Sequence, residues 1–89
     1  MAVTLIDPSP LDSSSSRQIN GDTGGATGLQ LSVVGLDHTH IEIPLAVNTN
    51  DFNFDLTIEV PAGTLHANKQ YRITITSSAP TVTLDISTF

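Results

Sequence analysis

The segment DFNFDLTIEV, residues 51–60, decides the fold class of this chain. Its apolar side chains occupy every second position, and polar side chains fill the positions between them. Successive side chains of a β-strand point to opposite faces, so this pattern is typical of a strand with one face in a hydrophobic core and the other in water. We therefore expect a strand over residues 51–60, with the rings of Phe52 and Phe54 in the core.

The same alternation recurs on both sides of this segment, and turn-forming residues separate the repeats at 35–37, 48–50, 61–63 and 77–80. No window combines the helical period with capping residues, so little or no helix is expected. Strands with one apolar face need a second apolar layer, which a β-sandwich supplies. The sequence therefore predicts an all-β fold, a small antiparallel β-sandwich of five to seven strands. The further strands are expected at 29–33, 41–45, 71–76 and 81–87.

The first third of the chain has a different composition. Residues 7–28 are rich in Ser, Gly, Asp and Pro, which predicts a tether without regular structure. A flexible tether of this length spans roughly 25 Å. We therefore predict an N-terminal arm over residues 1–28 and a sandwich domain over residues 29–89. The short strand at the start of the arm is predicted to assemble with a neighbour by adding to an exposed sheet edge; its residues are Ala2, Val3, Thr4, Leu5 and Ile6.

Composition excludes several classes of partner. The 89 residues include three Lys and Arg against nine Asp and Glu, a net charge of −6, with no basic cluster to bind nucleic acid or an anionic membrane. No apolar run reaches the ~20 residues that span a bilayer. Residues 1–6 lack the basic start of a secretory signal, so we expect no export by that route. The absence of Cys excludes disulfides, thiolate metal sites and thiol nucleophiles.

One tripeptide resembles a catalytic motif. Asp22-Thr23-Gly24 resembles the catalytic turn of aspartic proteases, in which two such aspartates share one proton across a dimer. In that family the motif follows a strongly apolar strand, whereas Asp22 follows polar residues and Gly21. The alternative is an ordinary Gly-rich turn, and we predict no catalytic residue and no enzymatic activity.

Two groups of side chains could bind a metal ion. His38 and His40 share one face of a strand and could ligate one metal, with His66 as a third ligand; on the axis of a trimer this resembles the His-x-His iron sites of phage tail spikes and fibres. The alternative is a solvated strand face. A run of oxygen side chains suggests calcium but lacks the glycine of the calcium-loop pattern, so we predict no metal and no cofactor. The run comprises Asn48, Asn50, Asp51, Asn53 and Asp55.

Residues 61–89 resemble the C-terminal part of fimbrillin-type pilus subunits from gut and oral bacteria. The shared features are a Leu-x-x-Asn-x-x-Tyr loop, a Thr-rich strand and a closing strand of alternating β-branched residues that ends in an aromatic. The resemblance implies a subunit that polymerises by donating a strand to its neighbour. The residues that carry it are Leu65, Asn68, Tyr71, Thr74, Thr76, Val82, Ile86 and Phe89.

These features together predict a non-enzymatic structural subunit of a large assembly. The expected role is a capsid decoration or head-stabilising protein of a tailed phage, located in the virion, which grips neighbours with its N-terminal arm. Its partners would be copies of itself, possibly in a trimer, or neighbouring structural proteins. The alternatives are a fimbrillin-like pilus subunit on the bacterial cell surface and a carbohydrate- or protein-binding β-sandwich module.

Overall fold

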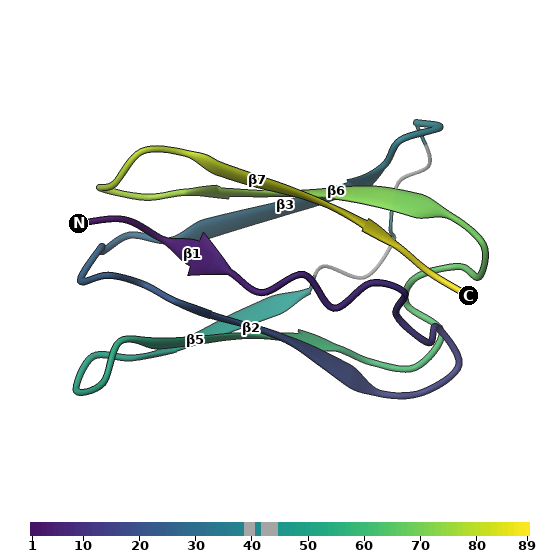
Figure 1. The fold of residues 1–89 in the computed structure, drawn as a ribbon, viewed down its shortest axis with the longest axis horizontal. Coiled ribbons are helices and arrows are strands. Elements are labelled where there is room, and N and C mark those ends of the chain that lie inside the picture. Colours follow the sequence, from purple (N-terminus) through teal and green to yellow (C-terminus); the bar gives the residue numbers. More distant parts are fainter. Residues whose placement is uncertain (39–40, 42–44) are drawn as a thin grey trace.

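The computed structural model describes residues 1–38, 41 and 45–89, and all the regular structure in these residues is β. Seven strands form a four-stranded sheet in the order β1-β2-β5-β4 and a three-stranded sheet in the order β3-β6-β7, with every neighbouring pair antiparallel. The two sheets face each other as layers (Figure 1), so the predicted small β-sandwich is confirmed. The strands are β1 (Thr4–Leu5), β2 (Arg17–Asp22), β3 (Gln30–Gly35), β4 (Ala46–Asn50), β5 (Asp55–Val60), β6 (Gln70–Thr76) and β7 (Val82–Ser87).

This strand order is that of the constant-type immunoglobulin sandwich, in which the first, second, fifth and fourth strands form one sheet and the others form the second. A further feature of such sandwiches is present near the start of β6. Tyr71 is fully buried, and its hydroxyl oxygen accepts a hydrogen bond from the backbone N–H of His66 at 2.7 Å, which is a tyrosine corner. Antibody domains have a disulfide cysteine two residues later; this chain has Ile73, which is fully buried.

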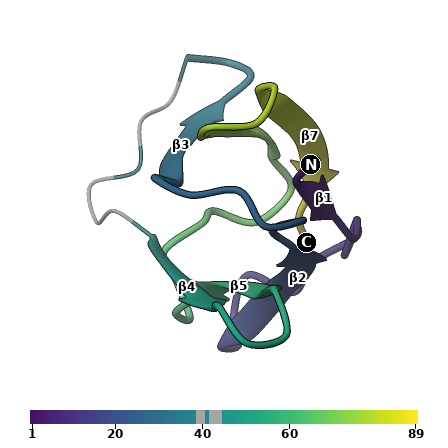
Figure 2. The ribbon, with the colours of Figure 1, turned by 90° about the vertical axis from the view of Figure 1, so that its left-hand side faces the viewer.

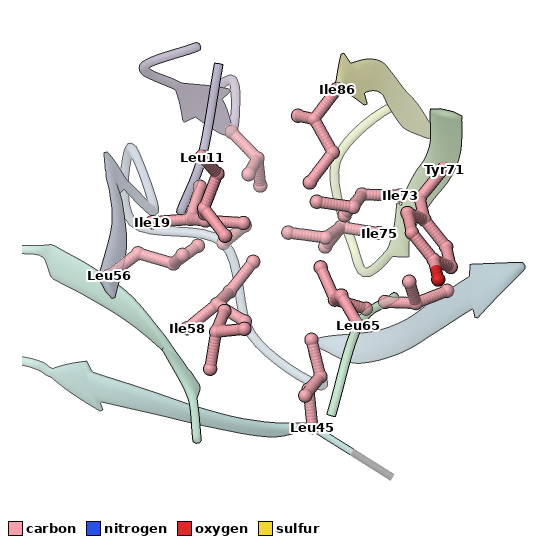
Figure 3. Close-up of a cluster of buried hydrophobic side chains, with 14 of the residues drawn as sticks. Leu11, Ile19, Leu45, Leu56, Ile58, Leu65, Tyr71, Ile73, Ile75 and Ile86 are labelled. Atoms are coloured by element: carbon pink, nitrogen blue, oxygen red, sulfur yellow. The ribbon is translucent and has the colours of Figure 1, made fainter. Parts of the chain in front are cut away.

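The core lies between the two layers and is almost entirely aliphatic. Figure 3 shows Ile19, Leu56 and Ile58 of one sheet facing side chains of the other sheet, among them Ile73 and Ile86. The alternation expected in 71–76 and 81–87 is confirmed, because the odd positions of β6 and the even positions of β7 point inward. The most deeply buried large side chains are Tyr71, Ile19, Leu56, Ile58, Leu65, Ile73, Ile75 and Ile86.

The prediction for the start of the deciding segment is wrong. The strand begins at Asp55, and the two aromatic side chains before it lie outside the core, with Phe52 97% and Phe54 45% exposed. The reason is local hydrogen bonding. The side-chain oxygen of Asn50 accepts from the N–H of Phe52 at 2.9 Å, and that of Asn53 accepts from the N–H of Asp55 at 3.2 Å. Asparagine side chains thereby stabilise a turn where the alternation alone predicted a strand.

Two neighbouring boundaries also differ from prediction. Residues 48–50, expected to form a turn, are the second half of β4. Of the strand expected at 41–45, Ile41 and Leu45 belong to no strand, and residues 42–44 lie outside the described part of the chain. Asn48 and Asn50 made the prediction of a turn ambiguous, because Asn is common in turns and also occurs on edge strands with its side chain in water.

The predicted tether is wrong over Arg17–Asp22. These residues form β2, an interior strand that pairs with β1 on one side and β5 on the other. Ile19 is fully buried, and Val3 and Leu11 also belong to the core. A single apolar side chain in a polar block gives little periodicity, yet β5 pairs with the strand along its whole length and β1 pairs with Gly21 and Asp22. In this structure residues 1–28 therefore share one core with residues 29–89, with no extended arm.

Candidate functional site

The predicted assembly residues lie in the first six positions, called here the N-terminal segment (residues 1–6). Figure 2 shows β1 on one side of the sandwich, between β7 of one layer and β2 of the other. Its pairing with β2 is short: Thr4 lies opposite Asp22, Leu5 lies opposite Gly21, and the N–H of Ile6 donates to the carbonyl of Asn20 at 2.8 Å. The segment is therefore a short edge strand.

Burial is uneven along this segment. Val3 is 4% exposed and contributes to the core, and Leu5 packs against the core while remaining partly exposed. Met1 and Ile6 are 73% and 67% exposed. One valine thus anchors a segment whose other apolar side chains lie partly or largely in water.

The chain changes layers directly after this segment. Hydrogen bonds from the side chain and the backbone N–H of Ser9 hold the pKa of the Asp7 carboxyl below its usual range. Leu11 then joins the other sheet: its N–H donates to Ser87 at 2.9 Å, and its carbonyl accepts from the N–H of Phe89 at 3.0 Å. Leu11 is 2% exposed. Residues 7–10 therefore form a linker between two separate attachments, one on each layer, and within it the hydroxyl of Ser9 also accepts from the N–H of Ser87 at 3.0 Å.

Gly21 makes room for β1. A β-carbon built on Gly21 would collide with the carbonyl oxygen of Thr4 and would lie 3.1 Å from a methyl group of Leu5. A glycine within a strand often marks the close approach of another backbone, and that is its role here. Sequence reasoning did not single out Gly21, because a glycine in a Gly-rich block carries no signal until the register of β1 and β2 is known.

The protease-like tripeptide forms a turn. The carboxylate of Asp22 accepts a hydrogen bond from the N–H of Gly24 at 2.6 Å, and Gly24 has a φ of 60°. The hydroxyl-bearing residue between them, Thr23, is buried, and its N–H donates to the carbonyl of Phe54 at 2.8 Å. This arrangement matches the Gly-rich turn that was the alternative to the catalytic motif.

The candidate metal ligands do not come together in the part of the chain that is described. His38 lies in an exposed turn with a φ of 70°, and His40 lies outside the described residues. Among the described His, Asp and Glu residues, no three are placed to share a metal ion. In the suggested calcium run, the side chains of Asn50 and Asn53 accept backbone hydrogen bonds within the turn.

Charged side chains form three ion pairs within the described residues: Arg17–Asp12 at 3.5 Å, Lys69–Asp37 at 2.7 Å and Arg72–Asp85 at 2.9 Å. Hydrogen bonds from the guanidinium of Arg72 hold the pKa of Asp85 below its usual range, and the same contact raises the pKa of Arg72. These pairs engage every Lys and Arg of the chain.

One surface depression, of about 620 Å³, lies over the start of β6 and the end of β7 and includes Leu36, Lys69 and Thr88 in its lining. Lys69 pairs there with Asp37, which raises the pKa of the ammonium group.

Comparison with known proteins gave a short result. No protein-family model matches this chain, and no curated protein matches it. Among the described residues, no helix is long and apolar enough to cross a membrane. Fold, surface and charge therefore supply the argument for function.

Proposed function

We propose that this protein is a non-enzymatic structural subunit of a large assembly and that its N-terminal segment attaches it to a neighbouring copy. One observation carries the proposal: β1 is a short edge strand, and the N-terminal segment that contains it has a single buried side chain, Val3, with Met1 and Ile6 largely in water. Two copies that exchange such a segment lose and regain the same hydrogen bonds and the same buried valine, so exchange costs little free energy.

The linker supports exchange between adjacent copies. The backbone of Leu11 is hydrogen-bonded to Ser87 of β7 and to Phe89, and neither bond involves β1. Residues 1–6 can therefore separate from β2 while residues 11–13 stay attached to the three-stranded sheet. A fully extended linker of four residues spans at most about 14 Å. The neighbour must therefore bring its own β2 edge close to that of the first copy, which favours a side-by-side arrangement.

For the assembly itself, we propose a decoration or head-stabilising protein of a tailed-phage capsid, located in the virion. The support is the single small core and a net charge of −6, which suits attachment to a protein shell and opposes binding to the packaged nucleic acid. The alternative is a pilus subunit on the bacterial surface. The motif that this chain shares with fimbrillin-type subunits, Leu65 to Tyr71, forms the tyrosine corner of an immunoglobulin-type sandwich. The motif therefore serves the fold, which either assembly could use.

The test is to block the docking of the segment without removing it. In Gly21→Ala, the added methyl group collides with Thr4 whether the segment comes from the same copy or from a neighbour. We expect the wild type to form multimers as its concentration rises, and Gly21→Ala to remain monomeric in native mass spectrometry and analytical ultracentrifugation. Val3→Asp, which removes the core anchor and leaves β2 intact, should behave in the same way.

Gly28→Ala is the matched control, because Gly28 has a φ of 66° and open space around its α-carbon. The added β-carbon meets no other atom, so Gly28→Ala carries the strain of a positive φ without blocking the docking of β1, and it should associate as the wild type does. A wild type that stays monomeric at every concentration, or a Gly21→Ala chain that associates normally, overturns the proposal. Mass spectrometry of purified phage particles and of purified pili from the source distinguishes the two assemblies.

A further inference from the structure

A second surface lies at one end of the sandwich and plays no part in the proposed exchange. It is the turn between β4 and β5, called here the tip (residues 50–55). In Figure 1 this turn lies at the same end as the β6–β7 turn and the β2–β3 loop. Phe52 at its apex is 97% exposed, whereas the large side chains of the core are almost completely buried. An aromatic ring that stands almost wholly in water on an ordered turn is free to enter a pocket of a partner, as the central aromatic anchors of protein interfaces do.

Three hydrogen bonds and one ring contact hold the tip in one shape. Asn50 and Asn53 accept from backbone N–H groups within the turn, and the carbonyl of Phe54 accepts from the N–H of Thr23 at 2.8 Å. Phe54 has a φ of 61°, and its ring reaches Gly25, where an added β-carbon would lie 3.7 Å away. The backbone that presents Phe52 is therefore ordered before any partner arrives, which lowers the entropy cost of binding.

The charges around the tip specify the partner's chemistry. Asp51 and Asp55 belong to the tip, and Asp22 lies directly opposite Asp55 across the β2–β5 pair. Like charges in directly opposite positions destabilise a sheet. No ion pair joins these three carboxylates to a Lys or Arg in the described part of the chain, since each of the three cations pairs elsewhere. A cationic partner would supply the missing counter-charge.

Other occupants fit this surface less well. No three carboxylates or histidines among the described residues converge on a metal position. An anionic membrane would be repelled by the three aspartates, and the tip of a second copy would carry the same charges. We propose that the tip is a docking surface for a protein partner that has an apolar pocket bordered by Lys or Arg side chains. Phe52 would fill the pocket, and the aspartates would speed association and fix its orientation.

The experiment uses the full chain with a photo-crosslinking benzophenone amino acid in place of Phe52. The near-complete exposure of this ring means that the replacement leaves the core unchanged. After irradiation in the source cells or particles, mass spectrometry identifies the cross-linked protein and the site of the cross-link. We expect a site inside an apolar pocket with Lys or Arg at its rim. A cross-link to a second copy, a lipid or a nucleic acid, or no cross-link at all, overturns the proposal.

Binding of the purified partner to the full chain then measures the contribution of each feature. Phe52→Ser should weaken binding by about tenfold or more, as expected for a central aromatic anchor. Asp51→Asn with Asp55→Asn should slow association and reduce its dependence on salt. Phe89→Ser is the matched control, because Phe89 is another exposed aromatic residue, 55% exposed, at the opposite end of the molecule. Equal affinities for wild type and Phe52→Ser overturn the assignment, whatever the outcome for the N-terminal segment.

Discussion

Removal of the hydroxyl group of Tyr71 should destabilise the whole sandwich. The ring is fully buried, and its hydroxyl oxygen accepts from the N–H of His66. Thr88 binds the same loop from β7's end, because its hydroxyl donates to the carbonyl of His66 and accepts from the N–H of Lys69 at 3.1 Å. Two side chains thus fix the connection between β5 and β6 to the three-stranded sheet.

Tyr71→Phe keeps the buried ring and removes the acceptor of the His66 N–H. This hydrogen bond is part-buried, and its loss should cost about 0.5–1.5 kcal/mol of unfolding free energy. For a domain of this size each kcal/mol lowers Tm by roughly 4–8 °C. Thermal and urea unfolding followed by circular dichroism measures both quantities in the wild type and the variant.

A double-mutant cycle distinguishes a shared loop from two separate effects. Thr88→Val acts on the same residue, His66. The unfolding free energy that the double variant loses should therefore differ from the sum of the two single losses by at least about 0.5 kcal/mol. Thr83→Val, on the exposed face of β7, should change stability by no more than about 0.5 kcal/mol. Additive effects, or a Tyr71→Phe variant as stable as the wild type, would refute the proposed role of the tyrosine corner.

Two further predictions concern the core and the response to acid. Ile19→Ala should cost about 2–5 kcal/mol in urea unfolding, because Ile19 is fully buried in β2, whereas a residue in a flexible tether would cost almost nothing. Hydrogen bonds from the side chain and backbone of Ser14 hold the pKa of Asp12 below its usual range. A carboxyl whose pKa is lower in the folded chain stabilises it above the unfolded-state pKa and loses that contribution as the pH falls through the folded-state pKa. Tm should therefore fall as the pH drops below about 4, and the fall should be shallower in Asp12→Asn.

The alternation of side chains was enough to predict the fold class, because it reports burial directly in Asp55–Val60, Gln70–Thr76 and Val82–Ser87. It failed at Phe52 and Phe54, where the apolar period continues into a turn that asparagine side chains stabilise. It also failed at Arg17–Asp22, where pairing on two edges forms a strand with a single fully buried aliphatic side chain. Local composition cannot report either effect, since both depend on hydrogen bonds.

The candidate site was predictable to a similar extent. An apolar start before a Pro-rich stretch led to the prediction that the N-terminal segment is an assembly strand, and that role stays a prediction; in the structure Val3 lies in the chain's own core. The need for Gly21 follows from the register with Leu5, and the exposure of Phe52 follows from the turn geometry. The first is a tertiary fact, and the second depends on which of two local patterns prevails, the alternation or the asparagine turn, so the order of the residues alone completed neither surface.

The sequence Asp22-Thr23-Gly24-Gly25 lies between the two proposed surfaces and supports both. A β-carbon on Gly24 would collide with the backbone of Ala2 in the N-terminal segment, whereas Gly25 lies against the ring of Phe54 in the tip. The bonds that hold this turn join Asp22 to Gly24 and Thr23 to Phe54, all within one copy. If a neighbour supplied the N-terminal segment, Ala2 of that neighbour would replace the copy's own, and these bonds would remain. The tip would therefore be presented in the same shape before and after exchange, so one subunit could hold its neighbour along one side and still offer Phe52 to a different partner at its end.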